Sequence, residues 1–351
     1  MAVSHEIQYF LGANSPTGFY SLYSELLPPE TASVIYILKG GPGCGKSTLM
    51  RQVAQQAAQA GETVEYILCS ADPDSLDAVV LPRLGAALVD GTAPHVVEPK
   101  YPGAVEQYVN LGDCYDRAGL RAIRGEILTC MDGYKEHYQR AYRCLDAAAE
   151  IQTDVRAMLA TPALEEKLAA RAHGILSREL KPKRSAPSGR VKQRFLDAVS
   201  HKGLITLFQT ACAQCTRIYE LSDSYGLAHL LLTHLLAGGV MGGYDVVACP
   251  DPMAPDRLSH LLVPEVGLAF LSASPFPGRP SRRLRLDAMV DRELLRRCRA
   301  RLRFARKVSS ALTGEAVESL AQAKAMHDGL EALYNPYVDF DRGQEMADRI
   351  A

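Results

Sequence analysis

SVIYILKGGPGCGKSTLM, residues Ser33–Met50, combines three local signals. Val34–Leu38 is apolar and β-branched, which favours a strand. Gly40–Ser47 follows and matches the pattern G-x-x-x-x-G-K-[ST] of a phosphate-binding P-loop. From Lys46 onward the residues are good helix formers. A strand, a glycine-rich loop and a helix in this order predict a nucleotide site rather than a turn that matches by chance.

The residues of this motif have separate chemical roles. Glycines let successive backbone N–H groups converge on phosphate oxygens, and the N-terminus of the following helix adds positive potential. Lys46 is expected to reach the β- and γ-phosphates, and the Ser47 hydroxyl to ligate Mg²⁺. The motif therefore predicts binding of a nucleoside triphosphate with Mg²⁺, with nucleotide contacts from Gly41, Gly43, Cys44, Gly45, Lys46, Ser47 and Thr48.

The pattern after the loop alternates between helix and strand. The helix is expected to end near Gly61, and Thr63–Leu68 and Gly85–Val89 are expected to form further parallel strands. Residues 71–75 are interpreted as a turn before a short helix, and Thr17–Leu27 as another short helix. This order predicts an α/β fold with a mainly parallel sheet, the three-layer αβα architecture of P-loop NTPases.

Polar residues are expected at the carboxyl edge of this sheet. Asp90 ends an apolar run, the setting of a second NTPase motif whose carboxylate holds Mg²⁺, with a turn-forming Asp as the alternative. Asp72 and Asp74 either assist the metal or the attacking group, or cap a helix. His95 either orients water or is a structural residue of a Pro-rich loop. Lys46 and Asp90 are the predicted catalytic residues.

The middle of the chain predicts the domain boundary. Residues 115–177 are amphipathic and are interpreted as a packed helical hairpin. Residues 181–192 are basic and contain Pro, Ser and Gly, so they are interpreted as a linker, with a lid over the nucleotide as the alternative. The predicted domains are an active P-loop domain over 1–180 and a second copy with a helical C-terminal region over 193–351.

The second half repeats the first in the same order. The matching segments include Tyr9–Leu11 with Arg194–Leu196, Ile35–Leu38 with Ile218–Leu221, and Leu81–Val89 with Val263–Leu271.

The active groups are missing from this second copy. When the two copies are laid together without gaps, His229 stands at the position of Lys46 and Ser272 at the position of Asp90. Asp223 would also repel a phosphate at this loop. We therefore expect one nucleotide per chain, and a second copy that serves in sheet packing, in dimerisation or as a wall over the active copy.

Composition sets broad limits on partners and compartment. The hydrophobic content of 47% and charged content of 23% are typical of a soluble globular protein. Lys plus Arg (39) nearly balances Asp plus Glu (40), so net charge does not indicate nucleic acid. Nine scattered cysteines suit a reducing cytoplasm, and neither a signal peptide nor a membrane span is predicted. The single C-x-x-C, Cys212–Cys215, lacks a second ligand pair for zinc.

Arg279–Lys307 is dense in arginine. One interpretation is an arginine finger that acts on the nucleotide within the chain or across a homodimer. Another is a surface for the nucleic-acid backbone. The favoured interpretation is a solvated helix face paired with nearby acids.

ILKGGPGCGKSTLM, CSADPDSLDAVVLP and VDGTAPHVVEPKYPGAVEQYVNLGD, together with the two-copy layout, resemble a family of bacterial tandem P-loop proteins. These proteins are described only as predicted ATPases or ATP-binding proteins. The resemblance covers the first half closely and the second half loosely, and it implies ATP binding at Gly40–Thr48 and Asp90. Family members have a phosphate loop in both halves, so this chain departs from them by lacking the second.

The expected function is Mg²⁺-dependent ATP binding and hydrolysis at a single site. A phosphotransferase is the first alternative, because Gly40–Gly43 and Asp90-Gly91 also resemble nucleoside monophosphate kinases, although those have G-K-G-T where this chain has Gly45–Thr48. The second alternative is an ATP-gated scaffold or nucleic-acid-binding protein without significant turnover. No N-K-x-D motif for guanine is present, which favours ATP over GTP.

Overall fold

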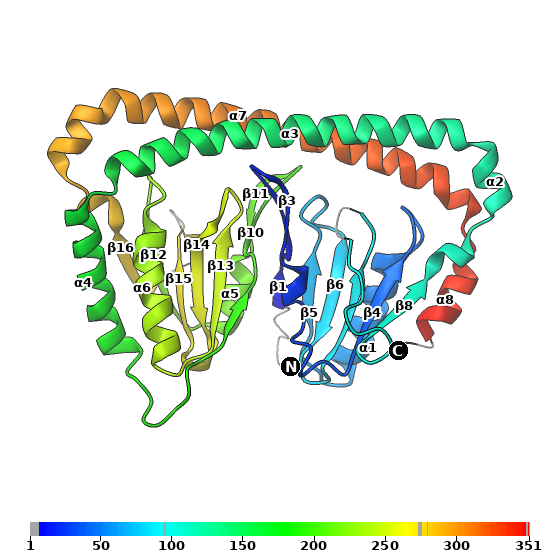
Figure 1. The fold of residues 1–351 in the computed structure, drawn as a ribbon, viewed down its shortest axis with the longest axis horizontal. Helices are drawn as coiled ribbons and strands as arrows, with labels where there is room; N and C mark the ends of the chain where they lie inside the picture. Colours follow the sequence, from blue (N-terminus) through cyan, green and yellow to red (C-terminus); the bar gives the residue numbers. More distant parts are fainter. Residues whose placement is uncertain (1–6, 94–95, 273–275, 279, 349, 351) are drawn as a thin grey trace.

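The computed structural model describes residues 7–93, 96–272, 276–278, 280–348 and 350. Two six-stranded sheets stand side by side beneath a pair of long helices that cross both of them (Figure 1). The α/β class is confirmed: both sheets are mixed, consist mostly of parallel strands and are flanked by helices.

The first sheet has the strand order β1-β5-β6-β7-β4-β8. Only β6 runs against the other strands, because its pairings with β5 and β7 are antiparallel and the remaining pairings are parallel. The strands are β1 (Ile7–Tyr9), β4 (Val34–Lys39), β5 (Glu65–Leu68), β6 (Leu76–Leu81), β7 (Ala86–Asp90) and β8 (Glu106–Asn110).

The second sheet repeats this arrangement with the order β9-β13-β14-β15-β12-β16, in which only β14 is reversed. The turns between equivalent strands also correspond, since Gly85 and Gly267 have φ values of 62° and 61°. This agreement is compatible with a duplicated αβα fold. The strands are β9 (Val191–Gln193), β12 (Arg217–Ser222), β13 (Val246–Asp251), β14 (Ala254–Val263), β15 (Leu268–Leu271) and β16 (Arg282–Arg285).

Two of the predicted short helices are wrong. The segment after residues 71–75 is β6, because Leu76–Leu81 is buried at every position and its β-branched residues suit a central strand. Within Thr17–Leu27 the chain forms β3 (Gly18–Ser21) and a 3₁₀ turn, η1 (Tyr23–Glu25). β3 pairs with β2 (Gly12–Ser15), and β10 (Asp197–Ser200) and β11 (Gly203–Thr206) form the equivalent hairpin in the second half.

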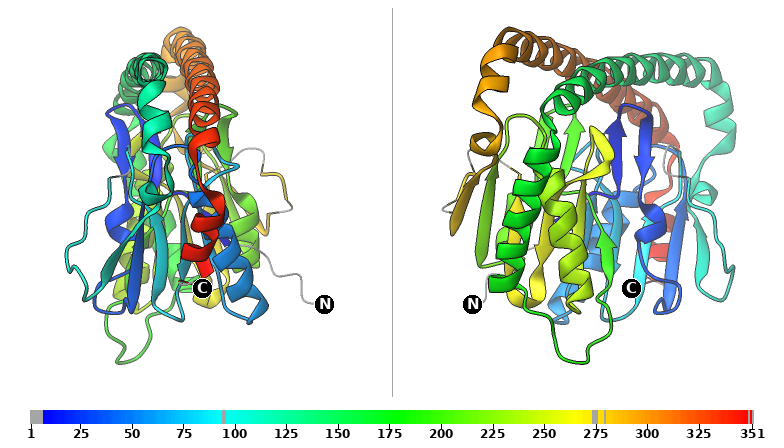
Figure 2. Two further views of the ribbon diagram at one scale, coloured as in Figure 1. Left: turned by 90° about the vertical axis from the view of Figure 1, so that its right-hand side faces the viewer. Right: turned by 60° about the vertical axis from the view of Figure 1, so that its left-hand side comes forward.

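The long helices differ from the predicted hairpin over 115–177. The region forms α2 (Arg117–Ala122), α3 (Arg124–Leu159) and α4 (Pro162–Glu179), but α3 packs along α7 (Arg292–Tyr334) and α4 packs on α6 (Ala228–Met241). Figure 2 shows α3 and α7 side by side from two further directions. Gly133 lies inside α3 close to α7, where the flexible end of Met326 occupies the space that a side chain at position 133 would take. The other helical elements are α1 (Lys46–Gln59), α5 (Phe208–Gln214), α8 (Phe340–Asp348), η2 (Leu111–Cys114), η3 (Pro264–Val266), η4 (Leu286–Met289) and η5 (Asn335–Tyr337).

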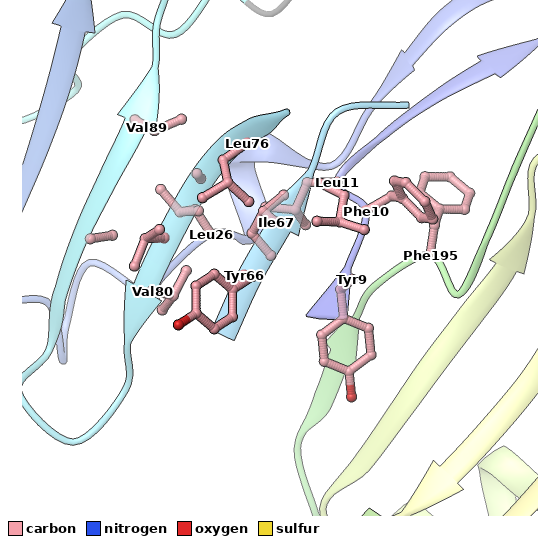
Figure 3. Close-up of a cluster of buried hydrophobic side chains, with 14 of the residues drawn as sticks. Tyr9, Phe10, Leu11, Leu26, Tyr66, Ile67, Leu76, Val80, Val89 and Phe195 are labelled. Atoms are coloured by element: carbon pink, nitrogen blue, oxygen red, sulfur yellow. The ribbon is translucent and has the colours of Figure 1, made fainter. Parts of the chain in front are cut away.

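The two halves share a buried core. Phe10 and Phe195 are fully buried, and each donates its backbone N–H to the carbonyl of the other, at 3.0 and 2.9 Å. Figure 3 shows their rings together beside the core of the first sheet. The buried carboxylate of Glu65 pairs with Lys192 and lies 3.5 Å from Arg194 of the second half. Both packing and paired charge therefore connect the halves.

Among the described residues, no helix combines the length and apolar character needed to cross a membrane.

Because Phe195 is shared between the halves, Phe195→Ala should destabilise the whole molecule. We expect a loss of about 3–5 kcal/mol in the free energy of unfolding, with both halves still unfolding in one transition. The chain has no Trp, so circular dichroism during urea unfolding is the measurement. Leu204→Ala is the control, because Leu204 is 63% exposed. Separate transitions for the two halves would contradict a shared core.

Candidate nucleotide site

Gly40–Ser47, called the glycine loop below, connects β4 to α1 at the carboxyl end of the sheet. β4 lies between β7 and β8, so the loop emerges from inside the sheet rather than from its edge. Gly43 and Gly45 have φ values of 70° and 85°, a backbone conformation that residues with a side chain rarely adopt. The expected strand, loop and helix are all present, and the helix begins at Lys46.

Lys46 and Asp90 lie close together above this edge. Lys46 Nζ donates to the carbonyl oxygens of Gly40 and Gly41 at 2.7 and 2.8 Å, and lies 3.5 Å from Asp90 Oδ2. The contact follows from the strand register, because Leu38 of β4 is directly paired with Asp90 of β7. Both side chains are mostly buried, at 12% and 14% exposure, so their charges interact with little solvent screening.

A cavity of about 960 Å³, called the loop cavity below, opens beside the glycine loop. The expected nucleotide contacts all line it, namely Gly41, Gly43, Cys44, Gly45, Lys46, Ser47 and Thr48, together with Asp72, Asp74 and Asp90. Ser47 Oγ accepts a hydrogen bond from the backbone N–H of Leu76 at 3.0 Å. Asp90 Oδ1 accepts from the Thr92 N–H at 2.8 Å and from the Thr92 hydroxyl at 2.5 Å. Asp90 therefore orders a turn while its other oxygen faces Lys46.

Asp72 and Asp74 do not cap a helix, because a strand follows them. Asp72 Oδ2 lies 3.4 Å from Lys324 Nζ, which comes from the C-terminal half of α7. Asp74 is 76% exposed and its Oδ2 lies 2.5 Å from Lys202 Nζ, whose hydrogen bond and charge lower the pKa of Asp74. His95 lies outside the described residues.

The far wall of the loop cavity comes from the two long helices, which sequence reasoning did not connect with this site. α3 contributes Ile127, Leu128, Met131, Tyr134 and Tyr138, and α7 contributes Lys324, His327, Glu331 and Tyr334. A side chain on Gly43 would come within 2.4 Å of the Asn335 amide, just beyond α7. With its nitrogen toward the loop, that amide donates to the carbonyls of Gly43 and Glu331 at 3.2 Å. The C-terminal segment therefore covers the glycine loop.

Tyr115 adds a further contact to this cover. Its hydroxyl is buried beside Gly41, and its ring lies 5.6 Å from that of Tyr334. Burial and the neighbouring Cys44 raise the pKa of Tyr115, so its phenol is neutral at physiological pH. No sequence signal links it to a loop some 70 positions earlier.

Metal-ligating atoms occur in two places beside this cavity. Ser47 and Asp90 offer a hydroxyl and a carboxylate, which are the hard oxygen ligands that Mg²⁺ takes. His327, Asp328 and Glu331 form a second group whose ligand atoms all lie within 4.8 Å of one another. Asp328 in that group is already hydrogen-bonded to Lys324.

The equivalent loop of the second half, Asp223–His229, contains its own carboxylate. Asp223 accepts from the backbone N–H groups of Ala228 at 2.6 Å and Tyr225 at 3.1 Å. The Ala228 N–H corresponds to that of Gly45, one of the groups that a phosphate-binding loop offers to its ligand, whereas Tyr225 stands where Pro42 has no N–H. Gly226 has a φ of 70°, the value seen at Gly43, but Ala228, which stands at the position of Gly45, begins α6 and lacks the positive φ of 85° that Gly45 has. The two loop backbones therefore agree at Gly226 and differ at Ala228. The arginines of β16 and α7 lie in this half, and none of the described ones lines the loop cavity.

Comparisons with known proteins give one finding. A family model described as Nephrocystin 3, N-terminal, matches residues 21–174, which include the glycine loop, Asp90, α3 and most of α4. No curated protein and no solved structure gives a match. The first half of the chain is thus similar to the N-terminal region of nephrocystin 3.

Proposed function

We propose that this protein is a P-loop NTPase that binds ATP with Mg²⁺ at the glycine loop and hydrolyses it. The observation that supports this most strongly is the meeting of Lys46, Ser47 and Asp90 at the loop cavity, beside two positive-φ glycines and the N-terminus of α1. Converging N–H groups, a lysine and two oxygen ligands are what a nucleoside triphosphate and its metal require.

In this proposal each residue has a defined task. Backbone N–H groups of Gly43–Lys46 bind the β-phosphate, and Lys46 exchanges the carbonyls of Gly40 and Gly41 for phosphate oxygens. Ser47 and Asp90 would hold Mg²⁺, which offsets negative charge on the phosphates. A water oxygen then bonds to the γ-phosphorus while the bond to the β,γ-bridging oxygen breaks, which yields ADP and phosphate. Lys46 stabilises the charge that develops on the transferred group.

The protein is proposed to prefer ATP, to bind one nucleotide per chain and to act in the cytoplasm. The resemblance to tandem P-loop proteins supports ATP over other nucleotides, and the second half lacks both the lysine and the Asp90 equivalent. We place the protein in the cytoplasm, because its nine cysteines are free thiols and a reducing compartment keeps them so.

Lys46→Ala should lower the rate of phosphate release by about a hundredfold or more, because it removes a group that stabilises transition-state charge. The assay measures phosphate release and MgATP affinity. Lys39→Ala is the matched control, since Lys39 Nζ is bound to Gly91, Val97 and Glu98. Unchanged affinity and turnover in Lys46→Ala would show that the site is elsewhere. ATP-dependent phosphorylation of an added acceptor, with little free phosphate, would instead identify a phosphotransferase.

Asp90→Asn should raise the Mg²⁺ concentration needed for half-maximal ATP hydrolysis by about tenfold, because an amide oxygen is a weaker ligand than a carboxylate. A magnesium titration at saturating ATP measures this shift. If the half-maximal concentration does not move, Asp90 acts only through its bonds to Thr92.

Gly43→Ala should abolish ATP binding and destabilise the fold. The positive φ costs about 1–2 kcal/mol, and the added methyl group also displaces the Asn335 amide. Gly61→Ala is the matched control, with a φ of 85° and nothing within 4 Å of the new methyl group. Calorimetric titration with ATP and thermal melting separate the two effects. Normal ATP affinity in Gly43→Ala would argue against the loop as the phosphate site.

A further inference from the structure

The N-terminal half of α7 presents a row of arginines along one face. Arg292, Arg296, Arg299, Arg303 and Arg306 follow one another at alternating steps of four and three, the spacing that keeps side chains on one side of a helix. Within the described part of the chain, only Arg296 of these five forms an ion pair, with Glu293 at 2.8 Å. All five are exposed, as expected of a solvated helix face. The expected pairing with acids is found at Arg283, Arg296 and Arg301 and, within the described residues, not at the other four members of this row.

These arginines line a second cavity, called the arginine cavity below. It has a volume of about 860 Å³ and is bordered by α7, by α3 and by the loop residues Asp223–Gly226. Its position in the second half corresponds to that of the loop cavity in the first. Among the described residues, six arginines line it against two aspartates, so positive charge predominates.

Arg156 of α3 is the most buried of these arginines. It is 5% exposed, and no atom of the described residues forms a hydrogen bond with its Nε. Its side chain packs on Gly226, where a methyl group would come within 3.3 Å of Arg156 Cδ. Its Nη2 donates to the Thr153 hydroxyl at 2.8 Å. A buried cation with an unpaired N–H is costly unless a ligand completes its partners.

Asp223 and Asp251, the two acids of the arginine cavity, interact with Arg156 by charge, but their hydrogen bonds go to backbone N–H groups. Asp223 is directed to its own loop, where it accepts from two backbone N–H groups. Asp251 accepts from the Met253 N–H at 2.9 Å. Burial raises the pKa of both carboxyls.

The equivalent wall of the loop cavity is different. The long helices α3 and α7 can be aligned from their first residues, Arg124 and Arg292. In this alignment Leu128 corresponds to Arg296, Met131 to Arg299 and Tyr138 to Arg306. The same alignment sets Lys324 at the position of Arg156. An apolar and aromatic wall in one cavity thus corresponds to a cationic wall in the other.

We propose that the arginine cavity binds a small molecule with two or more phosphate groups, held by Arg156, Arg299, Arg303 and Arg306. Guanidinium groups bind phosphate through two parallel hydrogen bonds, and Arg299–Arg306 extends over about 10 Å of helix, a length that suits such a molecule. The ligand phosphates lie on the arginines rather than on the loop, because the Asp223 carboxylate repels a phosphate there and already accepts from the Ala228 N–H. This site does not depend on ATP binding at the glycine loop.

The test uses the full chain with Lys46→Ala, which removes the main cation of the glycine loop, and titrates it with tripolyphosphate by calorimetry. We expect saturable binding of one molecule per chain. Adding Arg299→Gln and Arg303→Gln should weaken this binding by about tenfold or more for each arginine. Adding Arg297→Gln and Lys307→Gln instead removes the same charge outside the cavity lining and should change the affinity little.

Three results would overturn the proposal. One is no saturable binding of tripolyphosphate to the Lys46→Ala protein. Another is equal weakening by both pairs of substitutions, which would indicate diffuse surface charge. The third is tight binding of a single-stranded RNA oligonucleotide that tripolyphosphate does not displace, which would identify a nucleic-acid surface. Circular dichroism melts of both variants check that the fold is retained.

Discussion

The antiparallel packing of α3 against α7 is the constraint on which the rest of the molecule depends. Ion pairs and hydrogen bonds such as Arg140–Glu315 and Gln152–Ser309 hold the two helices in register across both sheets. At 43 residues, α7 extends about 65 Å, long enough to reach from one cavity to the other. The C-terminal part of α7, which begins over the second half, covers the glycine loop of the first half. The C-terminal part of α3, which begins over the first half, covers the loop Asp223–Gly226 of the second half. Neither cavity is therefore complete within one half of the chain.

The two loops show how related backbones can differ in their chemistry. Gly43 and Gly226 have the same φ, and the flanking strand and helix correspond, but the positive φ of Gly45 has no counterpart at Ala228, where α6 begins. In the first loop, Gly40–Thr48 line an open cavity together with Asp90. In the second loop the Asp223 carboxylate accepts from the Ala228 N–H, and the cationic residues of the cavity belong to α3 and α7. An internal carboxylate keeps the loop folded but takes the place of a phosphate.

The contact between the halves combines an apolar core with buried charge. Removing the charge partners of Glu65 would leave an unpaired carboxylate in the interior, a cost of several kcal/mol, so Lys192 and Arg194 fix how the sheets stand against each other. Arg194 also donates to the carbonyls of Glu25 and Leu26 at 2.7 and 3.1 Å, and these bonds hold the segment that precedes β4 against the second half. The position of the glycine loop therefore rests partly on residues of the second half.

The sequence by itself determined those features that depend on neighbouring residues. The strand, loop and helix around Lys46, the strand that ends at Asp90, and the shared order of segments in the two halves were all predicted from local patterns. Only the tertiary structure decided what depends on distant contacts. β6 is a strand because two neighbouring strands enclose it, although Asp72-Pro73-Asp74 before it resembles a helix cap. Asn335 lies on the glycine loop, and Arg156 lies on Gly226, because packing of α3 on α7 brings together residues that local patterns cannot connect.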